Sequence, residues 1–176
     1  QLGTGHAVSQ VMPSVDPAAN VLVVYGDVPL VQTQTLVRLV EAVEAGRLVL
    51  LTSVLSDPTG YGRIIRDDRG ELQEIVEEMD ASDEQKTISE INAGFIAAPA
   101  ALICDWLAHA SDANAQREYY FTDVVRFAVA AEVPVVTCAA TDPNEVQGVN
   151  SRAELAKAER VFQRRQAVRL MADGLS

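Results

Sequence analysis

Residues 21–27 read Val-Leu-Val-Val-Tyr-Gly-Asp, an apolar run that stops at a glycine followed by a carboxylate. The run is short, rich in β-branched residues and bounded by turn residues, which predicts a buried strand of the kind found in parallel sheets. Apolar residues at helical spacing predict an amphipathic helix over 36–43, and a second apolar run over 48–54 predicts another strand. Two strands joined by such a helix form a right-handed crossover unit with a parallel pair.

The rest of the chain alternates between strand and helix patterns. A hairpin is expected over 63–76, with its turn at Asp67-Asp68-Arg69-Gly70. The other expected elements are a strand over 88–97, helices over 99–109 and 121–131, a strand over 133–138, and a long final helix capped by Ser151. Parallel units with an inserted hairpin predict an α/β sandwich with a mixed, mostly parallel sheet.

The composition narrows the class of protein. The chain has 176 residues, enough for one well-cored domain, and its 14 basic against 25 acidic residues give a net charge of −11. Such a charge repels nucleic acid and anionic membranes, so neither is expected as a partner. No apolar run approaches the ~20 residues of a membrane helix. Two isolated cysteines give no disulfide framework, which favours a cytoplasmic location.

The chain begins without Met, at a stretch, Gln1-Leu2-Gly3-Thr4-Gly5, that is typical of a turn before a helix. We therefore expect the sheet to be truncated at its N-terminus, with a preceding strand absent. Backbone N–H groups at such a turn favour an acceptor-rich ligand, a nucleobase edge or a phosphate, at Gly3 and Thr4. An ordinary helix N-cap is the alternative.

Asp27 is the most informative single residue. It follows a predicted buried strand, and open α/β sheets bind ligands at the carboxyl ends of their strands. A carboxylate there suits Mg²⁺, which takes one or two protein oxygens; a cap of the following turn is the alternative. Asn150, just before the final helix, is either a second metal ligand beside Asp27 or a capping neighbour.

Other polar residues and glycines are candidates for binding a ligand. Glu77 ends a strand beside Glu78, and only one of the two can face a cleft, because adjacent strand residues point to opposite faces. Asn92 lies in a strand, where Asn is depleted, so its amide needs a sugar hydroxyl or a backbone partner. Gly62 belongs to a glycine-rich loop that either approaches a ligand or simply connects a hairpin.

Seven motifs follow one another along the chain. They are Gln1–Ala7, Tyr25–Leu30, Asp57–Ile64, Ile75–Glu77, Glu90–Gly94, Glu118–Asp123 and Val146–Arg152. This ordered series closely resembles the uridyltransferase domain of the bacterial bifunctional N-acetylglucosamine-1-phosphate uridyltransferase / glucosamine-1-phosphate N-acetyltransferase, over almost the whole chain. The resemblance implies a Rossmann-like nucleotidyltransferase sandwich that uses Mg²⁺.

The resemblance also implies a role for each matching position. The turn that contacts uridine matches Gly3 and Thr4. The strand end at the nucleotide diphosphate matches Tyr25, Gly26 and Asp27. The magnesium ligands match Asp27 and Asn150. Contacts to the N-acetylglucosamine moiety match Gly62, Glu77 and Asn92, with Asn150 nearby. The wall near the acetyl group matches Glu118, Tyr120 and Thr122, three residues that otherwise suggest a helix cap with core aromatics.

The implied reaction transfers UMP from UTP to N-acetylglucosamine 1-phosphate and gives UDP-N-acetylglucosamine, a cell-wall precursor, and pyrophosphate. Residues 1–152 would form a partial uridyltransferase domain, and 153–176 a helix leading to an absent hexapeptide-repeat domain. In the family that domain carries acetyl transfer from acetyl-CoA and forms a homotrimer. No general base is expected, and this piece alone is expected to be inactive.

Two alternatives remain open: a sister sugar-1-phosphate nucleotidyltransferase, and a non-catalytic module that binds a sugar nucleotide.

Overall fold

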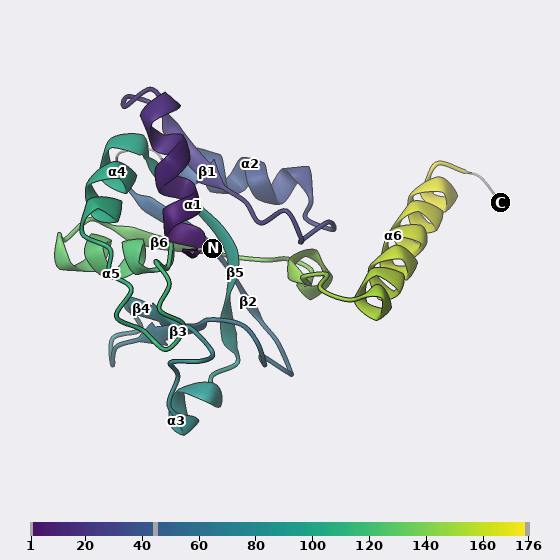
Figure 1. The fold of residues 1–176 in the computed structure, drawn as a ribbon. Helices are drawn as coiled ribbons and strands as arrows, with labels where there is room; N and C mark the ends of the chain where they lie inside the picture. Colours follow the sequence, from purple (N-terminus) through teal and green to yellow (C-terminus); the bar gives the residue numbers. More distant parts are fainter. Residues whose placement is uncertain (1, 44–45, 175–176) are drawn as a thin grey trace.

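The computed structural model describes residues 2–43 and 46–174, so Gln1 of the expected N-terminal turn lies outside it (Figure 1). Within these residues six strands form one mixed sheet of order β4-β3-β5-β2-β6, and β1 also pairs with β5. The strands are β1 Asn20–Val23, β2 Leu48–Val54, β3 Arg63–Arg66, β4 Leu72–Val76, β5 Glu90–Pro99 and β6 Val135–Ala139.

Helices occupy the segments where the sequence predicts them, including the two short helices expected over 6–12 and 80–86. They are α1 Thr4–Val11, α2 Thr33–Ala42, α3 Asp83–Lys86, α4 Ala100–Ala108, α5 Asp123–Ala130 and α6 Arg152–Ala172, with 3₁₀ turns at Met12–Ser14 and Pro143–Val146. The predicted N-cap of α6 is confirmed, since the Ser151 side chain accepts a hydrogen bond from the Glu154 N–H.

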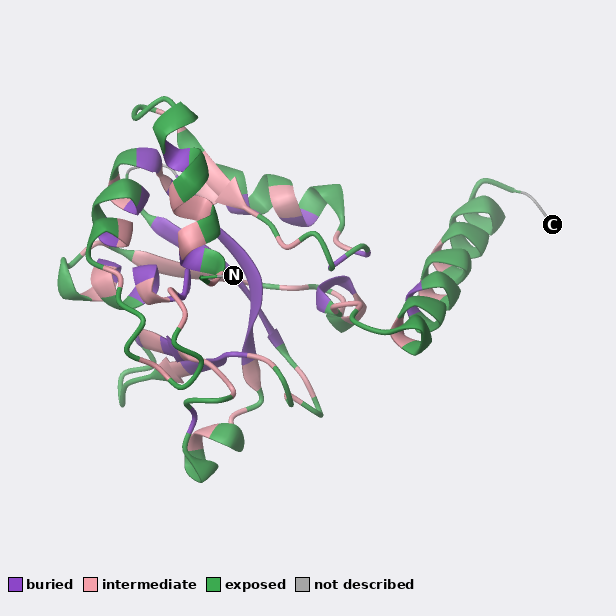
Figure 2. Cartoon of the chain, in the orientation of Figure 1, coloured by how far each residue is buried: buried purple, intermediate pink, exposed green. Residues whose placement is uncertain are grey.

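The sheet separates two apolar clusters, because successive residues of a strand face opposite sides. In β2, Leu48 and Leu50 belong to the cluster under α4 and α5, whereas Val49 and Leu51 belong to the cluster under α2. Strand β5 is buried along almost its whole length and runs through the middle of the molecule (Figure 2). The α/β sandwich with a mixed sheet is thus confirmed.

The prediction that the sheet is mostly parallel is wrong. Among the described residues β2 and β6 pair in parallel, and the other four pairings are antiparallel. Strands β1 and β2 do run in the same direction across α2, as a crossover unit requires, but each pairs with β5, which lies antiparallel between them. Strand β5, which is distant in sequence, thus lies between the two strands that were expected to pair in parallel.

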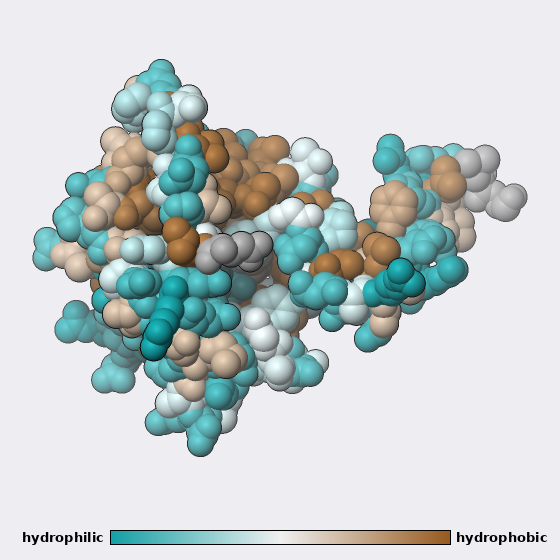
Figure 3. Space-filling view, in the orientation of Figure 1, coloured by the Kyte–Doolittle hydropathy of each residue, from teal (hydrophilic) through white to brown (hydrophobic). Residues whose placement is uncertain are grey.

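The strand β1 is less buried than its apolar run predicts. Its residues 21–23 are half-buried, and Val24 is 48% exposed. Apolar side chains gather between α1 and α2, over β1 (Figure 3). Within the described chain β5 is the partner of β1, so this strand forms a sheet edge.

The final helix α6 extends away from the sheet (Figure 1). It has 21 residues and few buried side chains. Among the described residues, no helix combines the length with the apolar character that crossing a bilayer requires.

Candidate active site

A cleft of about 380 Å³ opens where the loops after β1 and β4 meet the segment before α6. It gathers residues from five places in the sequence. Its walls include six of the residues singled out above: Tyr25, Asp27, Gly62, Glu77, Asn92 and Asn150. The topology therefore brings six of the twelve predicted site residues together.

Asp27 and Asn150 both line the cleft close to Gly148. A β-carbon at Gly148 would lie 3.8 Å from the Asp27 Oδ2 atom and 3.7 Å from the Asn150 Nδ2 atom. The Val149 N–H donates a 2.8 Å hydrogen bond to the Asp27 carbonyl oxygen, which fixes the two segments against each other. Both side chains are exposed to solvent and free to bind a ligand.

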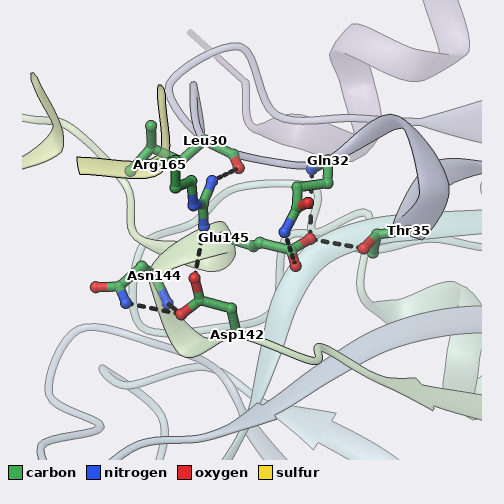
Figure 4. A network of polar contacts seen from close by, with 7 residues as sticks. All are labelled: Leu30, Gln32, Thr35, Asp142, Asn144, Glu145 and Arg165. Atoms are coloured by element: carbon green, nitrogen blue, oxygen red, sulfur yellow. Dashed lines mark hydrogen bonds and ion pairs between the residues drawn. The ribbon is translucent and has the colours of Figure 1, made fainter. Parts of the chain in front are cut away.

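A buried carboxylate holds these two segments together (Figure 4). Glu145 is 1% exposed and lies in the 3₁₀ turn before Asn150. Its carboxylate accepts hydrogen bonds from the Gln32 N–H at 3.3 Å, the Gln32 side-chain amide at 2.8 Å and the Thr35 hydroxyl at 2.6 Å. Gln32 and Thr35 form the start of α2, whose positive end favours a negative charge.

A second tie reaches the same segments from α6. The Arg165 guanidinium donates to the Leu30 carbonyl oxygen at 2.8 Å and pairs with the Asp142 carboxylate at 2.8 Å. Asp142 in turn accepts from the Asn144 N–H and side-chain amide (Figure 4). The loop that carries Asp27 and the loop that carries Asn150 are thus held by both α2 and α6.

A β-bulge in β5 shapes the floor of the cleft. The pairing of β2 with β5 slips between Leu50 and Thr52, opposite residues 92–96. Here the Gly94 N–H donates to the Asn92 side-chain oxygen at 3.1 Å, and Gly94 has a φ of +82°. A bulge re-aims the side chains of its strand, so Asn92 points into the cleft although its strand is buried.

The Tyr25 ring packs directly on Gly94. A β-carbon at Gly94 would lie 2.4 Å from the Tyr25 Cδ2 atom, so only glycine leaves room for the ring. Burial, with the nearby charges of Glu77 and Asp27, raises the pKa of Tyr25 to about 12. The Tyr25 hydroxyl therefore stays protonated and is available as a hydrogen-bond donor.

Replacing Gly94 by alanine is expected to lower the free energy of unfolding by about 2–3 kcal/mol, because strained backbone at positive φ costs about 1–3 kcal/mol and the Tyr25 ring must also move. Gly70→Ala is the matched control: Gly70 has a φ of +81° but no atom near its β-carbon position. Urea unfolding of both variants measures the difference. Equal losses in the two variants would contradict the proposed contact between Gly94 and Tyr25.

Glu77 lies partly buried on the wall opposite Asp27. Its carboxylate accepts a 2.7 Å hydrogen bond from the Thr122 hydroxyl, and a β-carbon at Gly62 would lie 3.2 Å from its Oε2 atom. Burial raises the pKa of the Glu77 carboxyl, the Thr122 hydrogen bond lowers it, and the charges of Asp80 and Asp123 raise it. The net direction is upward.

The raised pKa of Glu77 predicts how stability depends on pH. The folded state holds the Glu77 proton more tightly than the unfolded state, whose value is near 4.5. The stabilisation is complete below that value and is lost as the pH rises through the folded pKa. Glu77→Gln should remove this decline in urea-unfolding free energy above pH 4.5, whereas the exposed control Glu41→Gln should not. An identical decline in both variants would refute it.

The remaining predicted residues lie outside the wall of this cleft. The turn at Gly3 packs on residues 118–120: a β-carbon at Gly3 would lie 2.6 Å from the Tyr119 carbonyl oxygen. The Thr4 hydroxyl accepts from the Phe121 N–H at 3.0 Å. Thr4 and Gly26 line a second cavity of about 600 Å³, which Tyr25 and Asp27 also border.

Glu118, Tyr120 and Thr122 form one segment behind the cleft. The Glu118 N–H donates to the Asn114 side chain, the Tyr120 hydroxyl donates to the Gln116 side chain at 2.9 Å, and Thr122 contacts Glu77. Thr122 precedes α5 but its side chain makes no cap hydrogen bond. Of the three, Thr122 is therefore linked directly to a residue of the cleft wall.

Some residues that support the cleft were not predicted from the sequence as site residues. Tyr61 lines it, and its hydroxyl accepts from the Gly148 N–H at 3.4 Å. Glu154, three residues after the predicted cap Ser151, also lines it and accepts from the Asn150 N–H at 2.7 Å. The glycines on both sides of Tyr61 were the available signal, whereas nothing local in the sequence marks Glu145 as buried.

The donor set at Asp27 and Asn150 fits magnesium better than zinc. Within residues 2–43 and 46–174 no group of three or more His, Cys, Asp or Glu side chains could hold a metal ion. Mg²⁺ keeps several waters and needs one or two protein oxygens. Asp27 provides a carboxylate oxygen. Asn150 provides an amide oxygen, which faces the cleft when the amide plane is turned by half a turn.

Comparison with known proteins gives matches over the complete chain. The chain is 53% identical over 176 residues to the bifunctional protein GlmU of Stutzerimonas stutzeri, and 52% identical to GlmU of Pseudomonas putida and of Burkholderia lata. This chain is similar to GlmU along its whole length. It spans 38–39% of the length of these relatives. The resemblance found from the seven motifs is thereby confirmed, although no family model matches the chain.

Two solved structures share the fold of this GlmU-like chain. A Bacillus anthracis protein assigned as a glucose-1-phosphate thymidylyltransferase aligns with a TM-score of 0.61 at 15% identity, covering 90% of this chain and 60% of its own. A UDP-glucose pyrophosphorylase complexed with UDP-glucose aligns with a TM-score of 0.67 at 12% identity, covering 94% and 64%. The nucleotidyltransferase fold expected from the sequence is confirmed.

Proposed function

We propose that the protein transfers UMP from UTP to N-acetylglucosamine 1-phosphate and releases pyrophosphate. The main observation behind this proposal is that Asp27 and Asn150 lie close together beside Gly148, in a cleft that Glu77 and Asn92 also line. The similarity to GlmU over the whole chain supports the choice of a uridyltransferase within a fold that also serves other sugar nucleotides.

In this proposal the protein acts by holding two anions in line. Asp27 and Asn150 would hold Mg²⁺, which neutralises charge on the reacting phosphates. Glu77, Asn92 and the Gly62 backbone would accept and donate hydrogen bonds to the sugar and its N-acetyl group. The attacking phosphate is already deprotonated at neutral pH, so no side chain needs to act as general base. Positioning of two bound reactants supplies on the order of 7–11 kcal/mol.

The nucleotide side of the proposed site lies at the N-terminal turn. Gly3 and Thr4 would contact the uridine, and Tyr25 with Gly26 would adjoin the diphosphate. Thr4, Tyr25, Gly26 and Asp27 line one continuous cavity, which supports a ligand that reaches from the turn to the metal position. Glu118, Tyr120 and Thr122 would lie near the acetyl group, with Thr122 acting through its hydrogen bond to Glu77.

For the intact protein the proposal also includes a second domain beyond residue 176. Residues 1–152 would be a uridyltransferase unit, and 153–176 would lead to a hexapeptide-repeat domain that acetylates glucosamine 1-phosphate with acetyl-CoA and forms a homotrimer. The setting would be cell-wall precursor synthesis in the cytoplasm. The relatives are longer than this chain, which leaves room for such a domain.

The test is a pyrophosphate-release assay on the intact protein with Mg²⁺. UTP with N-acetylglucosamine 1-phosphate is expected to be the best pair among UTP or dTTP combined with N-acetylglucosamine, glucosamine or glucose 1-phosphate. A preference for dTTP and glucose 1-phosphate would replace the proposal with a sister nucleotidyltransferase. Calorimetric binding of UDP-N-acetylglucosamine without turnover of any pair would replace it with a binding module.

A further inference from the structure

Arg63 is a buried cation next to the cleft. It begins β3, and its side chain is 2% exposed. Its guanidinium donates to the Tyr61 carbonyl oxygen and forms a 2.7 Å ion pair with Glu78, which is 25% exposed. The Arg63 Nε atom has no hydrogen-bond partner among the described residues.

Stability alone does not account for a cation at this position. Burying a guanidinium costs several kcal/mol, and replacing a buried ion pair by apolar side chains of similar volume is often neutral or stabilising. Methionine has an unbranched, uncharged side chain that adapts to irregular space, so it could fill much of the volume of Arg63 without its charge. The role of Arg63, whose Nε–H has no partner, is therefore to be sought in the groups that its other N–H donors bind.

Those donors hold the middle of a short segment of the cleft wall, Thr59–Gly62. The Glu78 carboxylate that pairs with Arg63 also accepts from the Gly60 N–H at 3.3 Å, and Arg63 itself binds the Tyr61 carbonyl oxygen. At the far end the Gly62 carbonyl oxygen accepts from the Asn92 N–H at 2.8 Å. The backbone of residues 60–62 is thus fixed at three consecutive residues.

This segment lies between the two sides of the cleft. Gly62 packs against Glu77, and the Tyr61 hydroxyl supports the Gly148 backbone. A shift of residues 60–62 would therefore change the space in front of Glu77 and Asn92 directly, whereas Thr4 and Gly26 line a different cavity that residues 60–62 do not border.

We propose that Arg63 is a positioning residue, which through Glu78 and the Tyr61 carbonyl holds residues 60–62 in the shape that admits the sugar phosphate. This inference rests on the proposed function for the identity of the sugar phosphate. The guanidinium fork is essential to it, because lysine cannot bind a carbonyl and a carboxylate in the same fixed geometry.

The kinetic test compares Arg63→Met with Arg66→Met in the intact protein. Arg66 lies in the same strand and pairs with Glu90 at 2.7 Å, but it is 30% exposed and remote from residues 60–62. For Arg63→Met, KM for N-acetylglucosamine 1-phosphate should rise about tenfold, because small misplacements of binding groups are costly, while KM for UTP stays within about twofold. Arg66→Met should change neither constant. Equal rises in both KM values, or none, would overturn the positioning role.

A second readout does not depend on the substrate. Hydrogen exchange of the peptide covering residues 57–62 should accelerate in Arg63→Met and not in Arg66→Met. Arg63→Lys should restore the thermal midpoint more fully than it restores KM. Should Arg63→Met fail to fold, Glu78→Ala takes its place, since it removes the acceptor of both the Gly60 N–H and the Arg63 guanidinium and should raise the same KM and the same exchange rate; unchanged values there overturn the inference.

The two proposals fail in different ways. If the wild type uses another sugar phosphate, the proposed function is wrong, and the Arg63 comparison is repeated with that substrate. If the wild type uses N-acetylglucosamine 1-phosphate but exchange at residues 57–62 is the same in both methionine variants, the inference about Arg63 is wrong and the function stands.

Discussion

Asp27→Ala in the intact protein is expected to lower kcat by about a thousandfold or more, because a metal-held charge stabilises the transition state by several kcal/mol and each 1.36 kcal/mol is tenfold in rate. The fold should survive the change. Asp27 is exposed, and its carboxylate accepts no hydrogen bond within the described residues, so its loss leaves no buried donor unsatisfied.

The measurement is kcat as a function of Mg²⁺ concentration, together with urea unfolding. Asp68→Ala is the matched control, since Asp68 is an exposed carboxylate in the β3–β4 turn, away from the cleft. The free energy of unfolding should change little in both variants, and activity should fall in Asp27→Ala alone. Full activity of Asp27→Ala at limiting Mg²⁺ would refute the ligand role.

Glu145→Ala is expected to lower the free energy of unfolding by about 1–3 kcal/mol, because the buried Thr35 hydroxyl is left without an acceptor, whereas the exposed Gln32 donors can bind water. Three donors from Gln32 and Thr35 converge on this carboxylate, and Thr35 itself is 3% exposed. Release of the 3₁₀ turn should also displace Asn150 from Asp27, so activity should require more Mg²⁺ in the surviving folded fraction.

The control for this effect is Glu41→Ala, which removes an exposed carboxylate from the same helix α2 and should change stability by less than about 0.5 kcal/mol. The free energy of unfolding of Glu145→Gln should lie between those of Glu145→Ala and Glu41→Ala. The glutamine keeps one acceptor oxygen, but its amide N–H groups point toward the donors of Gln32 and Thr35. Urea unfolding of the three variants gives the comparison. A Glu145→Ala variant as stable as Glu41→Ala would show that α2 does not depend on the buried carboxylate.

Local patterns were sufficient to predict most helices and strands and the antiparallel β3–β4 hairpin, whereas the pairing directions of strands far apart in the sequence were not predictable. The apolar run at 48–54 is β2 residue for residue, because strand formation there depends on neighbours in sequence. The error lies in the unit 21–54, where the parallel pair expected between β1 and β2 is replaced by two antiparallel pairings with β5. No pattern within 21–54 reports that residues 90–99 insert between its strands.

In the candidate site, too, local features of the sequence were predictable and contacts between distant residues were not. Asp27 and Asn92 could be selected because a carboxylate at a strand end and an asparagine inside a strand are locally unusual. Glu145 and Arg63 resemble ordinary charged residues in the sequence, and they become notable only when burial is known, at 1% exposure each. Their partners, apart from Tyr61, lie far along the chain, so no motif of nearby residues could reveal them.

The bonds of Glu145 to Gln32 and Thr35 also bear on when the site comes into existence. They join residues 113 and 110 positions apart, which places them among the slow, late contacts of folding, after the β3–β4 hairpin and other local pairs. During synthesis on the ribosome, Asp27 is made early but has no counterpart until the stretch through Asn150 has emerged. The nascent chain therefore cannot complete this site before Asn150 has been translated.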